Sequence, residues 1–273
     1  MSDRTKSEKT GGNKTEREKD HQAHVASLAA ERRRETRFRV IAGVIVVIVV
    51  AAIISVPVLT NKDSTPTPLP TNNASAALPR GVNPTTYGVS YGTADVTKPE
   101  LQLWEDFQCP GCGGLESSNG TGIVKLADEG KMRLVWRPTT FLDQRLPQSD
   151  QASLRAAMAW GCAIDAGKTA QYHATVFANQ PSVEGSGYTD SQLLGFGKKA
   201  GIEGDAYTTF ENCFTSKKYQ GWVNNSAALF DSEGVPGTPT AYLTGKGLQH
   251  NEIPVDQLSD QTKLAEFIAQ ETG

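Results

Sequence analysis

The chain has 273 residues and a formal net charge of −3. Its 38% hydrophobic content and its mean hydropathy of −0.39 are low for a chain that is globular throughout. Residues 1–39 carry a net charge of +4, which leaves −7 for residues 40–273. The acidic remainder has no basic patch interleaved with aromatic residues, and this argues against nucleic-acid binding.

Two segments at the start of the chain indicate a membrane anchor. Residues 1–39 are rich in charged residues and predict a disordered tail. Residues 40–59 carry no charge, and twenty helical residues match the ~30 Å hydrocarbon layer. Five arginines crowd the N-terminal side of this span, so we expect a cytoplasmic tail and an extracytoplasmic remainder. A cleaved signal peptide is the alternative, but its apolar region is normally only ~7–15 residues long.

The rest of the chain predicts a linker followed by one folded domain. Residues 60–86 are rich in Thr, Pro, Asn, Ser and Ala, which is typical of a semi-extended tether. From residue 87 to 273 the apolar periodicity predicts an α/β domain with a helical block at about 148–233. Its other expected elements are strands at 88–93, 101–107, 132–141, 240–244 and 248–253, a helix at 115–129, and a closing helix around 264–268.

The sequence Cys109-Pro110-Gly111-Cys112 stands between an expected strand and an expected helix. The unpaired N–H groups and the dipole of that helix would stabilise a thiolate at Cys109, and the thiolate is the form that attacks a disulfide. Cys112 could then resolve the mixed disulfide. Pro110 suits the first turn of a helix. The motif therefore predicts dithiol redox chemistry without a cofactor.

A cysteine pair at this spacing has two other interpretations. It is half of a zinc site, but a zinc ribbon needs a second pair at similar spacing. Cys162 and Cys213 stand singly, so we expect no metal. A purely structural local disulfide is also possible for the spacing, although the Pro-Gly pair inside the motif favours redox chemistry.

Three features resemble the exported DsbA-like thiol:disulfide oxidoreductases of the thioredoxin fold. They are E-D-F-Q-C-P-G-C at 105–112, the helical block, and G-V-P-G-T-P-T at 234–240, directly before a strand. The resemblance covers about 85–273, and the tail, span and linker resemble membrane-anchored members. It implies reduced exported proteins as substrates and a quinone-linked membrane partner for re-oxidation. It also implies a cis Thr238–Pro239 bond beside the cysteines, where the Thr238 backbone could bind an extended substrate chain.

The sequence departs from the family at two positions. Well-known members carry His between the cysteines, where this chain has Gly111. Relatives often carry a carboxylate six residues before the first cysteine, a candidate proton acceptor, where this chain has Leu103. Glu105 lies on the same strand face as Leu103. Either Glu105 or Asp106 could replace the missing carboxylate, or both could face solvent.

The remaining cysteines predict a second disulfide. Cys162 and Cys213 each lie on an apolar helical face, and export would make oxidation the default. Free buried thiols are the alternative. The four histidines, His21, His24, His173 and His250, have no cysteine near them in sequence, and we interpret them as solvated or structural.

The sequence leaves two classes of function open. One is an extracytoplasmic enzyme of the cell envelope that exchanges disulfides. The other is a tethered binding module with structural disulfides only. Within the enzyme class, a lowered pKa at Cys109 would stabilise the dithiol form and so favour an oxidase. A reductase or an isomerase of the same fold is the alternative.

Overall fold

The computed structural model describes Asn73 and Asp95 and the ranges 75–93, 98–146, 150–245 and 248–272. The chain divides into two units, Met1–Pro66 and Thr67–Gly273, and all described residues belong to the second. No helix among them has the length and hydropathy needed to cross a bilayer. The expected tail at 1–39 and the expected span at 40–59 lie outside the described residues and stay predictions.

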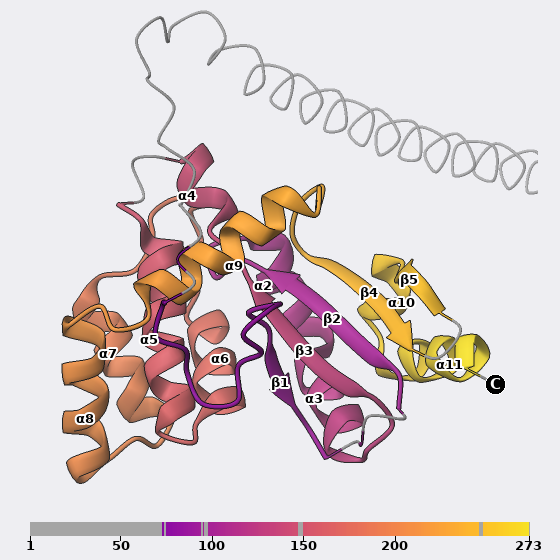
Figure 1. Ribbon diagram of the computed structural model, residues 1–273, viewed down its shortest axis with the longest axis horizontal. Helices are drawn as coiled ribbons and strands as arrows, with labels where there is room; N and C mark the ends of the chain where they lie inside the picture. Colours follow the sequence, from indigo (N-terminus) through magenta and orange to yellow (C-terminus); the bar gives the residue numbers. More distant parts are fainter. Residues whose placement is uncertain are drawn as a thin grey trace, which may run out of the picture. The chain divides into compact units, whose positions relative to one another are not determined.

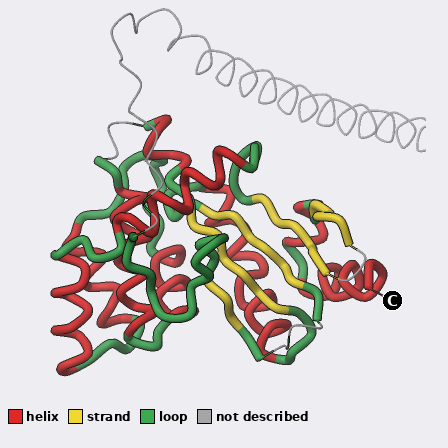
Figure 2. Tube along the Cα trace, viewed as in Figure 1, coloured by secondary structure: helices red, strands yellow, loops and turns green. Residues whose placement is uncertain are grey.

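The described strands form one five-stranded sheet in the order β1-β3-β2-β4-β5 (Figures 1 and 2). Only β2 and β3 run parallel, and the other neighbours are antiparallel. A parallel pair needs a crossover connection, which the helices after β2 provide. The strands are β1 (Val89–Tyr91), β2 (Glu100–Glu105), β3 (Arg133–Pro138), β4 (Thr240–Gly245) and β5 (Leu248–Glu252).

The alternation of side chains along β2 divides the core between two faces of the sheet. Leu101 and Leu103 are fully buried in the main core. Trp104 points to the other face, where it packs on Phe230 in a smaller cluster. Phe230 belongs to α9 (Gln220–Ser232), which crosses this face of the sheet in Figure 1. Both faces of the strand that carries the cysteines are therefore covered, which fixes its position.

One helical run follows the cysteine motif, in place of the helix expected at 115–129. It consists of α2 (Pro110–Leu115), a π-helix η1 (Glu116–Gly120) and α3 (Thr121–Asp128). The run begins earlier than expected because Cys109 is extended, with φ −70° and ψ 119°, and Pro110 occupies the first turn. The wider π turn lies just behind the cysteine motif, and such turns are frequent at functional sites.

The helical block lies beside the sheet (Figure 1). Its central helix α5 (Ala152–Asp165) is buried at nearly every position. A disulfide joins Cys162 of α5 to Cys213 of α8, with a Cα–Cα distance of 5.8 Å, so this expected pairing is present. The other helices are α4 (Phe141–Arg145), α6 (Thr169–Ala178), α7 (Asp190–Lys199) and α8 (Gly204–Thr215), with α10 (Val255–Leu258) and α11 (Gln261–Thr272) closing the chain.

The end of the expected linker packs against the helical block. The backbone N–H of Asn73 donates to Asn225 Oδ1 at 2.8 Å, and Asn225 Nδ2 donates to the Asn73 carbonyl at 2.9 Å. The backbone N–H of Arg80 donates to Asp165 Oδ1 at 3.0 Å. The expected boundary at residue 87 is therefore too late, because side chains of α5 and α9 satisfy backbone groups well before it.

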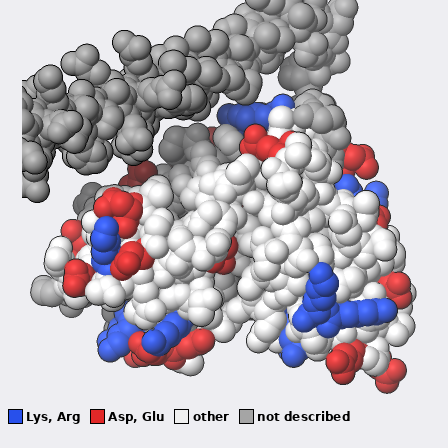
Figure 3. Space-filling view, turned by 180° about the vertical axis from the view of Figure 1, so that it is seen from behind, with Lys and Arg blue, Asp and Glu red and all other residues white. Residues whose placement is uncertain are grey.

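The side of the molecule opposite to Figure 1 carries charges of both signs near its margins (Figure 3). Lys and Arg atoms lie close to Asp and Glu atoms there, around a broad area with few charged side chains. Neither positive nor negative charge dominates this face, so it does not favour binding of a highly charged partner.

Candidate active site

Cys109 lies where three parts of the chain meet. It is the N-cap residue of α2, directly after β2. Its thiol donates a hydrogen bond to the carbonyl oxygen of Thr238 at 3.2 Å. The Thr238–Pro239 peptide bond is cis, as the resemblance implies. A Cβ added at Gly111 would lie 3.1 Å from Pro239 Cδ, so glycine permits the close approach of the two segments.

The two thiols of the motif have opposite proton affinities. The pKa of Cys109 is lowered to about 6, first because the Cys112 thiol donates a hydrogen bond to its sulfur. The backbone N–H groups of Gly111 and Cys112 add to this effect, while burial opposes it. Burial raises the pKa of the Cys112 thiol well above its ordinary value. At neutral pH the reduced pair therefore holds a thiolate at Cys109 and a proton at Cys112.

Two side chains from the helical block fix the backbone around Cys109. Gln180 Nε2 donates to the carbonyl oxygens of Phe107 at 3.0 Å and Cys109 at 2.9 Å. The Tyr188 hydroxyl donates to the Phe107 carbonyl at 2.7 Å. Sequence analysis missed both residues, because nothing in a loop 71 to 81 positions downstream signals a contact with the motif.

Asp106 supports the turn that leads into the motif. One carboxylate oxygen accepts hydrogen bonds from the Gln108 N–H at 2.8 Å and the Ser153 hydroxyl at 2.6 Å. The other accepts from the Leu142 N–H at 2.9 Å. Burial raises its pKa to about 7 against these hydrogen bonds. Since both oxygens are occupied, Asp106 positions the backbone and is a poor candidate for the proton acceptor.

Glu105 is the last residue of β2, four positions before Cys109, and is 5% exposed. The solvent-facing alternative is therefore wrong for both Glu105 and Asp106, because helices cover this end of β2. Burial raises the pKa of Glu105 well above its ordinary range, and charge on Cys109 raises it further. Charge on Glu105 in turn raises the pKa of Cys112. This electrostatic coupling makes Glu105 the carboxyl group that fits the expected proton acceptor.

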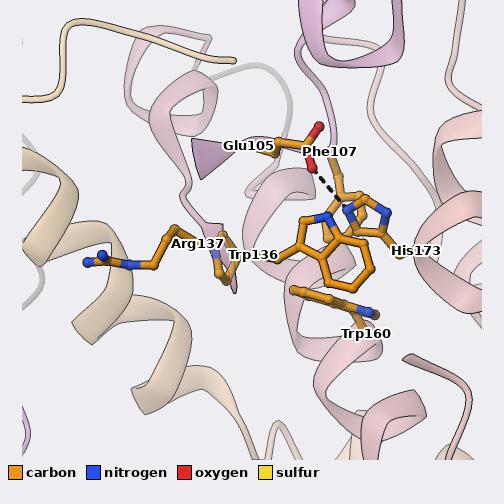
Figure 4. A pocket seen from close by; sticks show the side chains of 7 residues that line it. Glu105, Phe107, Trp136, Arg137, Trp160 and His173 are labelled. Atoms are coloured by element: carbon orange, nitrogen blue, oxygen red, sulfur yellow. Dashed lines mark hydrogen bonds and ion pairs between the residues drawn. The ribbon is translucent and has the colours of Figure 1, made fainter. Parts of the chain in front are cut away.

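Glu105 pairs with a histidine that the sequence analysis assigned no catalytic role. Its Oε2 lies 3.1 Å from His173 Nε2 (Figure 4). His173 is 3% exposed, which excludes the solvated interpretation. Its Nδ1 lies 3.8 Å from Oε2 of Glu116, and burial lowers the pKa of the imidazole. The pairing spans 68 positions and left no signal in the sequence. His21 and His24 lie outside the described residues.

Comparison with known proteins agrees with this geometry. A family model described as thioredoxin matches residues 85–263. The search of curated proteins found no match. Among solved structures, MdbA, a thiol-disulfide oxidoreductase from Actinomyces oris, is 21% identical with a TM-score of 0.57, over 75% of this chain and 100% of that chain.

Two further solved structures are similar over most of the described part. DsbA from Mycobacterium tuberculosis is 25% identical with a TM-score of 0.55, over 68% of this chain and 93% of that chain. BdbD from Bacillus subtilis is 20% identical with a TM-score of 0.55, over 74% and 99%. The chain belongs to the thioredoxin family and is a protein thiol–disulfide oxidoreductase, for which the Cys109–Cys112 pair beside a cis-proline is the candidate active site.

Proposed function

We propose that this protein works as an oxidase, which passes the Cys109–Cys112 disulfide to reduced proteins. The observation that carries the proposal is the low pKa of Cys109, about 6 against an ordinary 9.0. A stabilised thiolate favours the dithiol form, and each pKa unit corresponds to ~30 mV in a two-electron couple. At pH 7 a thiol with a pKa of about 6 is deprotonated about ten to one, which makes the disulfide more oxidising by roughly 30 mV than an unperturbed pair.

The burial of the two sulfurs supports the order of steps. A substrate thiolate attacks Cys109, the disulfide bond breaks, and Cys112 leaves as a thiolate. A second substrate thiolate then attacks the substrate sulfur of the mixed disulfide, which releases Cys109 as a thiolate and forms the substrate disulfide. The substrate loses two electrons and the pair gains them. Cys112 is fully buried, whereas Cys109 keeps 8% exposure, so only Cys109 is open to attack.

Thr238 and Pro239 are the proposed substrate-binding residues. Pairing of β4 with β2 begins only at Thr240, so the sheet does not engage the Thr238 backbone. That backbone lies against the attacking sulfur, since the Thr238 carbonyl oxygen is 3.2 Å from Cys109 Sγ. An extended substrate chain could hydrogen-bond to it and bring its own sulfur to Cys109.

The proposed location is the outer side of a cell membrane, within the cell envelope. Residues 40–59 would form the single-pass signal-anchor in the lipid bilayer, residues 1–39 the cytoplasmic tail, and the part of 60–86 before Asn73 the linker. The Cys162–Cys213 disulfide supports an extracytoplasmic domain, because such bonds persist in oxidising compartments. Exported proteins would be the substrates, and a quinone-linked membrane partner would restore the disulfide.

A reductase or isomerase of the same fold is the alternative, favoured by Gly111 and Leu103 at positions where relatives carry His and a carboxylate. A binding module with structural disulfides only fits less well, because a structural sulfur needs no lowered pKa.

Measurement of the equilibrium potential of the Cys109–Cys112 pair against glutathione tests the direction. We expect a value clearly above ~−270 mV, the thioredoxin range, and disulfide formation when oxidised protein meets a reduced unfolded substrate. The Cys109→Ser variant is the control and should form none. A potential at or below the thioredoxin value would assign the protein to the reductases.

A further inference from the structure

Cys112 exchanges a proton with its surroundings in every redox cycle, yet its side chain is fully buried. We infer that Glu105, His173 and Glu116 form a proton relay that connects Cys112 with a solvent-filled groove between α3 and α6. The relay rests on the proposed disulfide exchange and adds the route of its proton. Of the three residues, the sequence suggests only Glu105.

The inner end of the relay is Glu105. Its Oε2 is bonded to His173, while its Oε1 is buried and has no hydrogen-bond partner among the described residues. A small cavity of about 10 Å³ adjoins the carboxyl group, roughly the space of one water molecule. A carboxyl group with one unpaired oxygen can take or give a proton there. The backbone N–H of Asp106, the residue after Glu105, hydrogen-bonds to the Cys112 sulfur, which brings Cys112 to the end of β2 where Glu105 lies. Charge on Glu105 also raises the pKa of Cys112.

The middle of the relay is the His173 ring. Four aromatic side chains surround it, with Trp136 nearest at 4.7 Å between ring centroids, and the others are Phe107, Trp160 and Phe177. Arg137 lines the cavity but points away from the ring in Figure 4, toward Gln102 and Glu233. The two nitrogens of the ring therefore face one carboxyl group each. An imidazole can accept a proton at one nitrogen and release one from the other.

The outer end of the relay is Glu116 in the π turn. It lines a groove of about 550 Å³ together with Ala170, Phe177 and other residues of α3 and α6. A Cβ added at Gly120 would collide with Glu116 Oε2, so glycine leaves the space for this carboxyl group. Burial raises the pKa of Glu116 to about 7, and charge on Glu105 contributes. Both protonation states are therefore populated near neutral pH.

The geometry fits a relay better than a metal site. The three side chains offer ligand atoms within 4.8 Å of one another. However, Glu105 approaches Nε2 of His173 and Glu116 approaches Nδ1. Each carboxyl group thus meets a different nitrogen of the ring, which is the arrangement that a relay requires, whereas an ion would need both carboxyl groups at the same nitrogen.

When a substrate thiolate opens the disulfide, Cys112 leaves with the bonding electrons and takes a proton from Glu105. Glu105 regains a proton from Nε2 of His173, whose Nδ1 takes one from Glu116, and Glu116 takes one from water. Re-oxidation reverses each transfer. The 3.8 Å between Nδ1 and Glu116 must close by roughly half an ångström, or one water must bridge it.

The test compares Glu116→Gln with Asp128→Asn, each of which removes one carboxylate from the same groove. Asp128 is exposed and has no contact with His173, so it is the matched control. The reduction of the oxidised protein by dithiothreitol is followed by stopped flow across pH, in water and in deuterium oxide. We expect Glu116→Gln to slow the reaction about tenfold or more and to enlarge the solvent isotope effect. Added imidazole should restore part of the rate.

Three measurements exclude a merely structural effect. The equilibrium potential and the pKa of Cys109 should be unchanged in Glu116→Gln, because the relay affects a rate only. Gly120→Ala, which displaces the Glu116 carboxyl group, should reproduce the slowing. Cys109 and the neighbouring Asp106 also titrate in this pH range. They are present in every variant, so their effect on the rate is the same in Glu116→Gln and in Asp128→Asn.

Equal rates and isotope effects in Glu116→Gln and Asp128→Asn would overturn the relay. So would a slowing accompanied by an equal shift in potential. The proposed function fails separately, if wild-type protein forms no disulfides in a reduced substrate.

Discussion

The molecule contains two cysteine pairs whose surroundings differ in almost every respect. Cys162 and Cys213 lie on two packed helices and are joined across 51 positions. Cys109 and Cys112 are two positions apart at a helix start, and both are free thiols. The first pair is oxidised and does not titrate, whereas Cys109 of the second pair receives hydrogen bonds from N–H groups and from the Cys112 thiol. The reactivity of Cys109 therefore depends on its local hydrogen bonds. The Cys162–Cys213 disulfide contributes to stability because it closes a long loop of the unfolded chain.

The largest expected effect is on catalysis. Cys109→Ser should abolish disulfide exchange, because no other sulfur of the motif is accessible, and leave the free energy of unfolding of the reduced protein within about 1 kcal/mol. Oxidation of a reduced unfolded substrate and denaturant unfolding measure the two effects. Residual exchange in this variant would mean that Cys112 can be attacked directly.

The second cysteine pair should show the opposite behaviour. Replacing both Cys162 and Cys213 by Ala should lower the free energy of unfolding by about 4 kcal/mol, the loop-entropy value for 51 residues. The potential of the Cys109–Cys112 pair should stay the same. Urea unfolding and glutathione equilibration check these outcomes. A shift of the potential by more than ~30 mV would show that the pairs are coupled.

The pH dependence of Cys109 sharpens the comparison further. Its pKa of about 6 means that alkylation of the reduced protein should fall about tenfold from pH 7 to pH 5. The unfolded thiol has a pKa of ~8.5, so the thiolate stabilises the reduced fold fully above that pH, and this stability is lost as pH falls through about 6. Alkylation rates measured by mass spectrometry should assign the low-pH reactivity to Cys109 alone. Reaction at Cys112 in this range would contradict its buried, protonated state.

The smallest expected effect concerns Gln180, the side chain of the helical block that binds the backbone around Cys109. Gln180→Ala removes two hydrogen bonds to the backbone before α2 and should cost about 1–2 kcal/mol of stability. Exchange should slow several-fold, since Cys109 is held less firmly. Gln171→Ala, at an exposed position of α6, is the matched control. Thermal unfolding and exchange rates that match the control would show that Tyr188 suffices to hold the segment.

The sequence by itself determined the features that depend on neighbours along the chain. The order of strands and helices follows from apolar periodicity, and the redox pair from a C-x-x-C motif between a strand and a helix. Thr238 and Pro239 were assigned through the resemblance, because only the family pattern connects them with the cysteines. The span at 40–59 rests on hydropathy alone and stays a prediction.

Tertiary structure decided what surrounds the sulfurs. Both Glu105 and Asp106 are buried, and their partners separate them: Cys109 raises the pKa of Glu105, whereas Asp106 accepts hydrogen bonds from Gln108 nearby and from Leu142 and Ser153 in distant segments. The chain folds His173 against Glu105 across 68 positions. Periodicity and capping act over a few residues, whereas the proton affinity of a buried group depends on the dielectric and the partners that the completed core places around it.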